Sequence, residues 1–115
     1  MGQQSSAIRD AHLYAELWVS LASLLRSYTA AHGLNGNRQA TIELGEQKII
    51  ARHAEKWLTL SRDDARVAWT RENGSGGTLE FTLDGRLRSS TPDDVARPEE
   101  ELDMAAEAWA RELMQ

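Results

Sequence analysis

The segment from Ser6 to His32 constrains the fold more than any other stretch of the chain. At about 100° per residue, its apolar side chains form two adjacent stripes along one helix. The first stripe consists of Tyr14, Leu17, Leu21, Leu24 and Tyr28, and the second of Ala11, Ala15, Trp18, Ala22 and Leu25. Together they cover roughly two thirds of the circumference, against the ~100° stripe of an ordinary surface helix. We therefore expect a long helix that is covered from more than one direction.

The remaining arc of this helix is narrow and polar. It consists of Arg9, His12, Glu16, Ser20, Ser23 and Ser27. Because Glu16, Ser20 and Ser23 interrupt the apolar run, we do not expect the helix to span a membrane.

Short signals flank the helix. Ser5 or Ser6 is placed to cap its first turn, and Gly33 to end it in the left-handed conformation, ahead of a turn-rich loop at 34–37. Residues 1–6 match the short N-myristoylation pattern, but no polybasic second signal accompanies them, and no secretion signal is visible. We therefore expect neither acylation nor export, and a cytoplasmic protein.

From Ala40 onward the period of the apolar residues changes from helical to two, which predicts strands. The alternation covers 40–44, 67–69, 79–83 and, after a tight turn at Asp84-Gly85, 86–88. A turn is expected at 62–64, and the glycine-rich run 74–77 is expected to form a flexible hairpin connection.

The segment Lys48 to Leu60 fits two interpretations. A short helix would bring together Ile49, Ile50, His53, Ala54 and Trp57. Two strands turning near Ala54-Glu55 would instead align Ile49 and Ala51 with Leu58 and Leu60. We favour the strands because strand signals surround the segment and sequential hairpins are common.

The last segment predicts a helix with one apolar face. Pro98 suits the first helical position, and Glu99 to Glu101 would lie in the first turn, where the helix dipole favours negative charge. The apolar face consists of Leu102, Ala105, Ala106, Trp109 and Leu113. The order of elements predicts a single α+β domain over residues 1–115: a long N-terminal helix, an antiparallel meander of about five or six strands, and a C-terminal helix packed on one face of the sheet.

Charge and composition narrow the chemistry. The chain has no cysteine, which excludes disulfides, thiolate metal sites and a cysteine nucleophile. Its formal net charge of −5 argues against a general nucleic-acid binder, since such proteins are normally basic. The outer face of the predicted sheet would carry Arg52, Arg66, Arg86 and Arg88 with Thr41, Thr59, Thr70, Thr78 and Thr82. Trp57 is the one aromatic residue expected there, and Glu43 and Glu80 interrupt the positive charge, so we interpret this face as solvated.

No catalytic constellation is visible. His12 and Glu16 lie four apart on the first helix, but no third metal ligand accompanies them, so we expect no metal and no cofactor. Paired carboxylates occur at 63–64, 93–94 and 99–101, in turns or at a helix start, where solvated or dipole-complementing charge is the usual role. No serine lies in a nucleophile elbow, and the glycine run lacks the lysine of a phosphate loop. We therefore expect no catalytic residue and no enzyme.

The width of the apolar arc is the strongest indication of function. The chain also has four tryptophans, more than a core of this size usually holds: Trp18, Trp57, Trp69 and Trp109. Tryptophan is enriched at protein interfaces. We predict a non-enzymatic protein-interaction module, adaptor-like or chaperone-like, that forms a homodimer. The predicted interface is the stripe Tyr14, Leu17, Leu21, Leu24 and Tyr28. The alternative is a small-molecule carrier with an apolar pocket between the first helix and a curved sheet.

Overall fold

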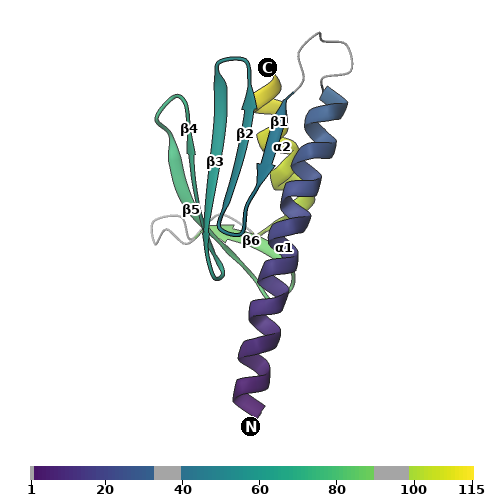
Figure 1. The fold of residues 1–115 in the computed structure, drawn as a ribbon, viewed down its shortest axis with the longest axis vertical. Helices are drawn as coiled ribbons and strands as arrows, with labels where there is room; N and C mark the ends of the chain where they lie inside the picture. The colour runs from purple at the N-terminus through teal and green to yellow at the C-terminus, as the bar shows by residue number, and fades with distance from the viewer. Residues whose placement is uncertain (1, 33–39, 90–98) are drawn as a thin grey trace.

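A computed structural model describes residues 2–32, 40–89 and 99–115 of the chain. The described elements are α1 (Gly2–His32), β1 (Thr41–Leu44), β2 (Lys48–His53), β3 (Lys56–Asp63), β4 (Arg66–Arg71), β5 (Gly76–Phe81), β6 (Arg86–Ser89), β7 (Glu100–Glu101) and α2 (Leu102–Met114). The α+β prediction is confirmed: a helix, an antiparallel sheet and a C-terminal helix packed on the sheet (Figure 1). The sheet has seven strands rather than the expected five or six.

The seven strands follow one another in sequence order, and each described pair is antiparallel. The strand interpretation of the ambiguous segment is confirmed, because Ile49 pairs with Leu60 across the turn at Ala54-Glu55. Leu60 in turn lies opposite Trp69 of β4. Since alternate residues of a strand point to the same face, these pairs place one continuous apolar surface under the two helices.

The glycine-rich run has a different role from the one expected. The turn occupies 72–75, whereas Gly76 and Gly77 belong to β5 and pair with Thr70 and Trp69. A Cβ atom on Gly77 would lie only 2.9 Å from Nε1 of Trp69, and one on Gly76 only 2.7 Å from the Trp69 carbonyl oxygen. These two glycines therefore allow Trp69 to pack closely against the neighbouring strand, and flexibility is not their function.

Several predicted boundaries shift by a few residues. β3 continues to Asp63, so its turn lies at 64–65, and β5 ends at Phe81, which leaves Leu83 exposed in the turn before β6. The tight turn at Asp84-Gly85 is confirmed, with Gly85 at a φ of +83°. α1 begins at Gly2, so the expected serine caps lie inside the helix.

The start of α2 differs for a physical reason. Glu100 and Glu101 pair with β6 as the short strand β7, and the helix begins only at Leu102. The three glutamates 99–101 therefore precede the helix instead of forming its first turn. The predictions for Gly33, the loop at 34–37, the carboxylates at 93–94 and Pro98 lie outside the described residues.

The core lies between the sheet and the two helices. α1 contributes Trp18, Leu21, Ala22 and Leu25, the sheet contributes Ile49, Ala51, Leu58, Leu60, Val67, Phe81 and Leu87, and α2 contributes Leu102, Ala105, Ala106 and Leu113. The main packing partner of α1 is α2, with β1 beside it, and the N-terminal turns of α1 continue beyond the end of the sheet (Figure 1). The predicted polar arc is exposed wherever its side chains are described, at His12, Glu16, Ser20, Ser23 and Ser27. In the described parts of the chain, neither helix combines the length and the apolarity needed to cross a membrane.

Candidate binding groove

The five residues expected at a subunit interface lie against the chain's own core. Leu21 is 0% exposed, and the other four residues, Tyr14, Leu17, Leu24 and Tyr28, are partly buried and packed against the core. Most of the apolar arc of α1 is therefore covered within a single chain, and Ala11 is its one exposed residue. A homodimer stays a prediction, and it would have to bury a surface other than that of Leu21.

The two tyrosines near the ends of this stripe each contact another element. The ring of Tyr14 stacks on Phe81 of β5, with centroids 6.4 Å apart and an interplanar angle of 13°, and burial raises the pKa of this tyrosine. The hydroxyl of Tyr28 donates a hydrogen bond to the carboxylate of Asp103 in the first turn of α2, and this bond raises the pKa of Tyr28. The ring of Tyr14 thus connects α1 to β5, and the hydroxyl of Tyr28 connects it to α2.

An open groove of about 840 Å³ runs along the other side of α2, between that helix and strands β4 to β7. Its floor consists of Trp69, Leu79 and Leu87, its helical wall of Met104, Ala105, Ala108, Trp109 and Glu112, and its end of Arg86, Glu99, Glu100 and Glu101. The alternative function placed a pocket beside the first helix. The groove lies beside the last helix instead.

Side-chain size explains why this space stays open. The indole rings of Trp69 and Trp109 meet at 6.5 Å between centroids and an angle of 55°, and both residues are half-buried. Between them and the end of the groove, α2 presents the small side chains of Ala105 and Ala108 together with Met104. Met104 is 60% exposed, and exposed methionines are common at adaptable binding surfaces because the thioether is flexible and polarisable.

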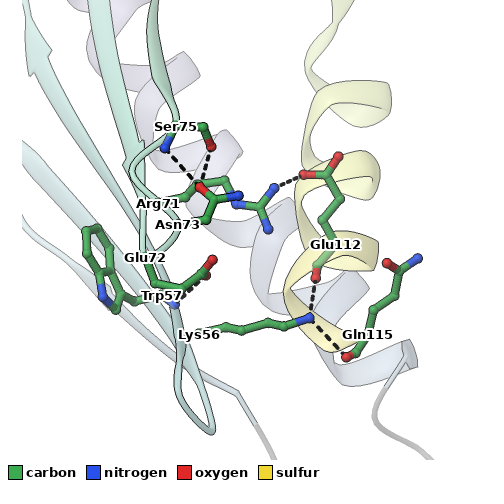
Figure 2. Close-up of polar contacts among 8 residues, drawn as sticks. All are labelled: Lys56, Trp57, Arg71, Glu72, Asn73, Ser75, Glu112 and Gln115. Carbon is green, nitrogen blue, oxygen red and sulfur yellow. Dashed lines mark hydrogen bonds and ion pairs between the residues drawn. The ribbon is translucent and has the colours of Figure 1, made fainter.

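The charges along the groove are mostly negative. Four glutamates and one arginine line it, and Glu99, Glu100 and Glu101 are all exposed where β7 leads into α2. Glu101 precedes the helix without a side-chain capping hydrogen bond to it. The carboxylate of the fourth glutamate, Glu112, pairs with Arg71 of β4 (Figure 2). The negative charge is therefore concentrated at the end of the groove where α2 begins.

The C-terminal end of α2 is held in place by the β2–β3 hairpin. Nζ of Lys56 donates hydrogen bonds to the carbonyl oxygens of Glu112, at 3.4 Å, and Gln115, at 3.0 Å (Figure 2). A cation at the carbonyl end of a helix satisfies groups that have no partner within the helix and complements the helix dipole. Together with the Arg71–Glu112 pair, this contact fixes the helical wall of the groove.

The other residue groups considered in the sequence do not form a comparable site among the described residues. Among the described residues no three His, Cys, Asp or Glu side chains gather as a metal site would require, and His12 and Glu16 are exposed on α1. On the outer face of the sheet, the register places Arg52 between Thr41 and Trp57 as expected. The register also places Arg86 on that face, two residues from Arg88, and Arg86 borders the groove as well.

The groove residues had separate interpretations in the sequence. Trp69 and Trp109 were interpreted as core residues, or as core residues that also belong to a protein interface, and Glu99 to Glu101 as charges that complement the helix dipole. The number of tryptophans was the signal that indicated a binding surface at these residues. Exposed Met104 and half-buried Ala108 carried no sequence signal, because the space beside them depends on where α2 lies on the sheet.

We compared the chain with protein-family models, with curated proteins and with solved structures. None of the three comparisons finds a match. The groove is therefore the feature of the molecule that bears on its function.

Proposed function

We propose that this protein is a non-enzymatic protein-interaction module whose partner binds in the groove between α2 and strands β4 to β7. One observation carries the proposal: Trp69, Trp109 and Met104 line an open groove beside the buried core. Leaving apolar surface in water costs about 25 cal/mol per Å² relative to burying it. Tryptophan and methionine side chains that line an open groove are characteristic of protein interfaces.

The open shape of the groove favours a polypeptide segment as the ligand. Small-molecule sites bury about 70–90% of their ligand, which requires enclosing walls. Here Met104, Arg86 and all four glutamates of the lining are exposed, and only Leu87 and Ala105 are fully buried. A groove that is open along its length suits an extended or helical segment of a partner protein.

A small-molecule carrier is the second candidate, and the size of the groove favours it. The volume of about 840 Å³ falls within the range of about 300–1,000 Å³ that ligand pockets occupy. A carrier purified from cells would retain its ligand, which native mass spectrometry detects as a defined added mass. An interaction module would show the mass of the chain alone.

The proposed function is tested by filling the groove. Ala108→Trp places a large side chain between α2 and the sheet floor, whereas Ala68→Trp makes the same change at an exposed position on the opposite face of the sheet. Peptides are selected from a random display library on the unmodified protein and then measured against both variants. We expect the selected pool to bind the Ala68→Trp protein normally and the Ala108→Trp protein at least about tenfold more weakly.

Circular dichroism and thermal melting first establish that both variants are folded. Met104→Asp, at an exposed position, gives a second groove variant that does not depend on packing. If no selected peptide discriminates between the groove variants and the control, the groove is not the interaction site and the proposal is wrong.

We propose separately that any homodimer forms through the edge strand β1. The indole Nε1 of Trp18 donates a hydrogen bond to the Gly45 carbonyl oxygen at 2.8 Å, which holds α1 beside the end of β1. Val19 and Leu44 are 51% and 42% exposed in that region, and an edge strand offers backbone groups to a second copy. Light scattering at micromolar concentration should give a dimer for the unmodified protein and a monomer for Leu44→Lys. A monomer at every concentration of the unmodified protein would exclude the dimer.

A further inference from the structure

We infer that the segment bound in the groove is basic: an apolar stretch of a partner protein that carries a lysine or arginine. The inference rests on the proposed function and adds the chemistry of the ligand. A positively charged side chain would face the glutamates at 99–101, and the indoles of Trp69 and Trp109 offer a second place for one. Three features of the groove support this assignment.

The first feature is charge. Glu99, Glu100, Glu101 and Glu112 line the groove against a single arginine, Arg86. The Glu112 carboxylate already pairs with Arg71, and Arg86 lies opposite Glu101 in the β6–β7 pair. The remaining negative charge of the lining therefore lies in the three consecutive glutamates before α2, where three carboxylates accompany one guanidinium. An acidic segment would be repelled by them, whereas a basic one would be attracted and oriented, because complementary charge sets the specificity and the association rate of an interface.

The second feature is the pair of indoles. A lysine or arginine is attracted to the face of an aromatic ring, and to indole most strongly. Trp69 and Trp109 are tilted at 55° rather than stacked in parallel, and both are half-buried at the groove. Elsewhere in the same molecule Arg62 lies 5.9 Å from the ring centroid of Trp18, which shows the geometry that we propose for the ligand.

The third feature is length. From Glu101, at the N-cap of α2, to Glu112 the groove spans about 16 Å at ~1.5 Å per helical residue. A strand of about five residues covers that distance at ~3.3 Å per residue. Such a segment can place an apolar side chain against Met104 and Ala108 and a charged one toward the glutamates, which matches the division of the lining into an apolar floor and an acidic end.

A pair of variants at one exposed position tests the sign of the charge. Met104→Arg and Met104→Glu remove the same apolar side chain, and neither affects the core because Met104 is 60% exposed. Against peptides selected as described above, we expect Met104→Arg to weaken binding about tenfold more than Met104→Glu. The selected peptides should be enriched in lysine and arginine, and their affinity should fall as the salt concentration rises.

A second comparison separates the groove from the net charge of the chain. The triple variant Glu99→Gln, Glu100→Gln and Glu101→Gln changes the charge at the groove. The control Glu16→Gln, Glu43→Gln and Glu46→Gln changes the net charge by the same amount at exposed positions outside the groove. We expect about tenfold weaker peptide binding for the first triple variant and less than about a twofold change for the control.

The outcomes distinguish the two proposals. Peptides that depend on the groove but are neutral or acidic would overturn the basic ligand and leave the interaction module standing. Equal losses in the two triple variants, or equal losses at Met104→Arg and Met104→Glu, would overturn it as well. If no peptide depends on the groove, the proposed function fails, and the basic ligand fails with it.

Discussion

The two sides of α2 show how one helix can close a core and also border a binding groove. On one side, Ala106, Ala110 and Leu113 are buried where the helix meets α1 and the central strands. On the other side, Met104 and Trp109 face a groove that no second helix fills among the described residues. Both sides carry alanines at helical spacing. Where another element lies against α2, the small alanine side chains allow the two to pack closely. Where no element lies against the helix, the same small side chains leave the groove open.

The largest expected difference between the two sides concerns stability. Leu21→Ala removes a fully buried side chain of α1 on the filled side and should lower the free energy of unfolding by about 2–5 kcal/mol. Met104→Ala on the open side should change it by less than about 0.5 kcal/mol. Urea unfolding monitored by circular dichroism measures both. A nearly neutral Leu21→Ala would mean that the filled side is not closely packed.

The next prediction compares two alanines of the same helix. Ala106→Leu enlarges a side chain that is 0% exposed and should cost about 1–3 kcal/mol through overpacking. Ala108→Leu points into the groove and should change stability by no more than about 0.5 kcal/mol. Because the change in helix propensity is nearly the same for the two substitutions, the difference between their free energies of unfolding measures how much space lies on each side of α2. Equal costs would contradict an open groove.

A smaller effect is expected at the groove floor. Gly77→Ala would place a Cβ atom 2.9 Å from Nε1 of Trp69, so the indole must move, at a cost of about 1 kcal/mol. Gly74→Ala is the control, since Gly74 has a φ of +87° and no atom within 4 Å of an added Cβ, so its cost of about 1 kcal/mol comes from the backbone alone. Tryptophan fluorescence should change in Gly77→Ala and stay unchanged in Gly74→Ala. The opposite pattern would show that the glycine does not position the indole.

The smallest effect concerns pH on the filled side. The hydrogen bond to Asp103 raises the pKa of Tyr28 above 10.0, and burial does the same for Tyr14. A raised pKa means that folding favours the protonated phenol, so this contribution is fully present below pH 10 and is lost as the pH rises through the folded-state pKa. Ultraviolet titration should show both tyrosines ionising later than in the unfolded chain, and Tyr28→Phe should remove one of the two delayed transitions. Ionisation of both at their ordinary pKa would contradict these contacts.

The fold was predictable because its signals are local. The period of the apolar residues distinguishes the helices from most of the longer strands, and the turn at Asp84-Gly85 follows from a short sequence signal. For β2 and β3 the period fitted a helix as well, and the strand signals on either side decided between the two interpretations. The two-residue strand β7 was missed because its pairing depends on the free edge of β6 rather than on its own residues. The start of α2 shifted for the same reason.

The groove was not predictable, and the covering of α1 was predicted only in part. The periodicity of α1 showed how wide its apolar arc is, but the covering of Tyr14 and Tyr28 depends on where Phe81 and Asp103 come to lie. An open space has no residues of its own and therefore no sequence pattern. Its lining comes from four strands and a helix, and only the three-dimensional arrangement brings Trp69 beside Trp109.

The packing of α1 on α2 also has a consequence for synthesis on the ribosome. The sheet can form hairpin by hairpin as it emerges, since each strand pairs with the one before it. α1 is made first, but its main partner begins only at Leu102, some 70 residues after His32. At roughly 5–20 residues per second, that interval is on the order of 4–14 s. During that time the apolar side of α1 that packs on α2 has no partner. That surface is open to chaperones and to premature association until α2 has been synthesised.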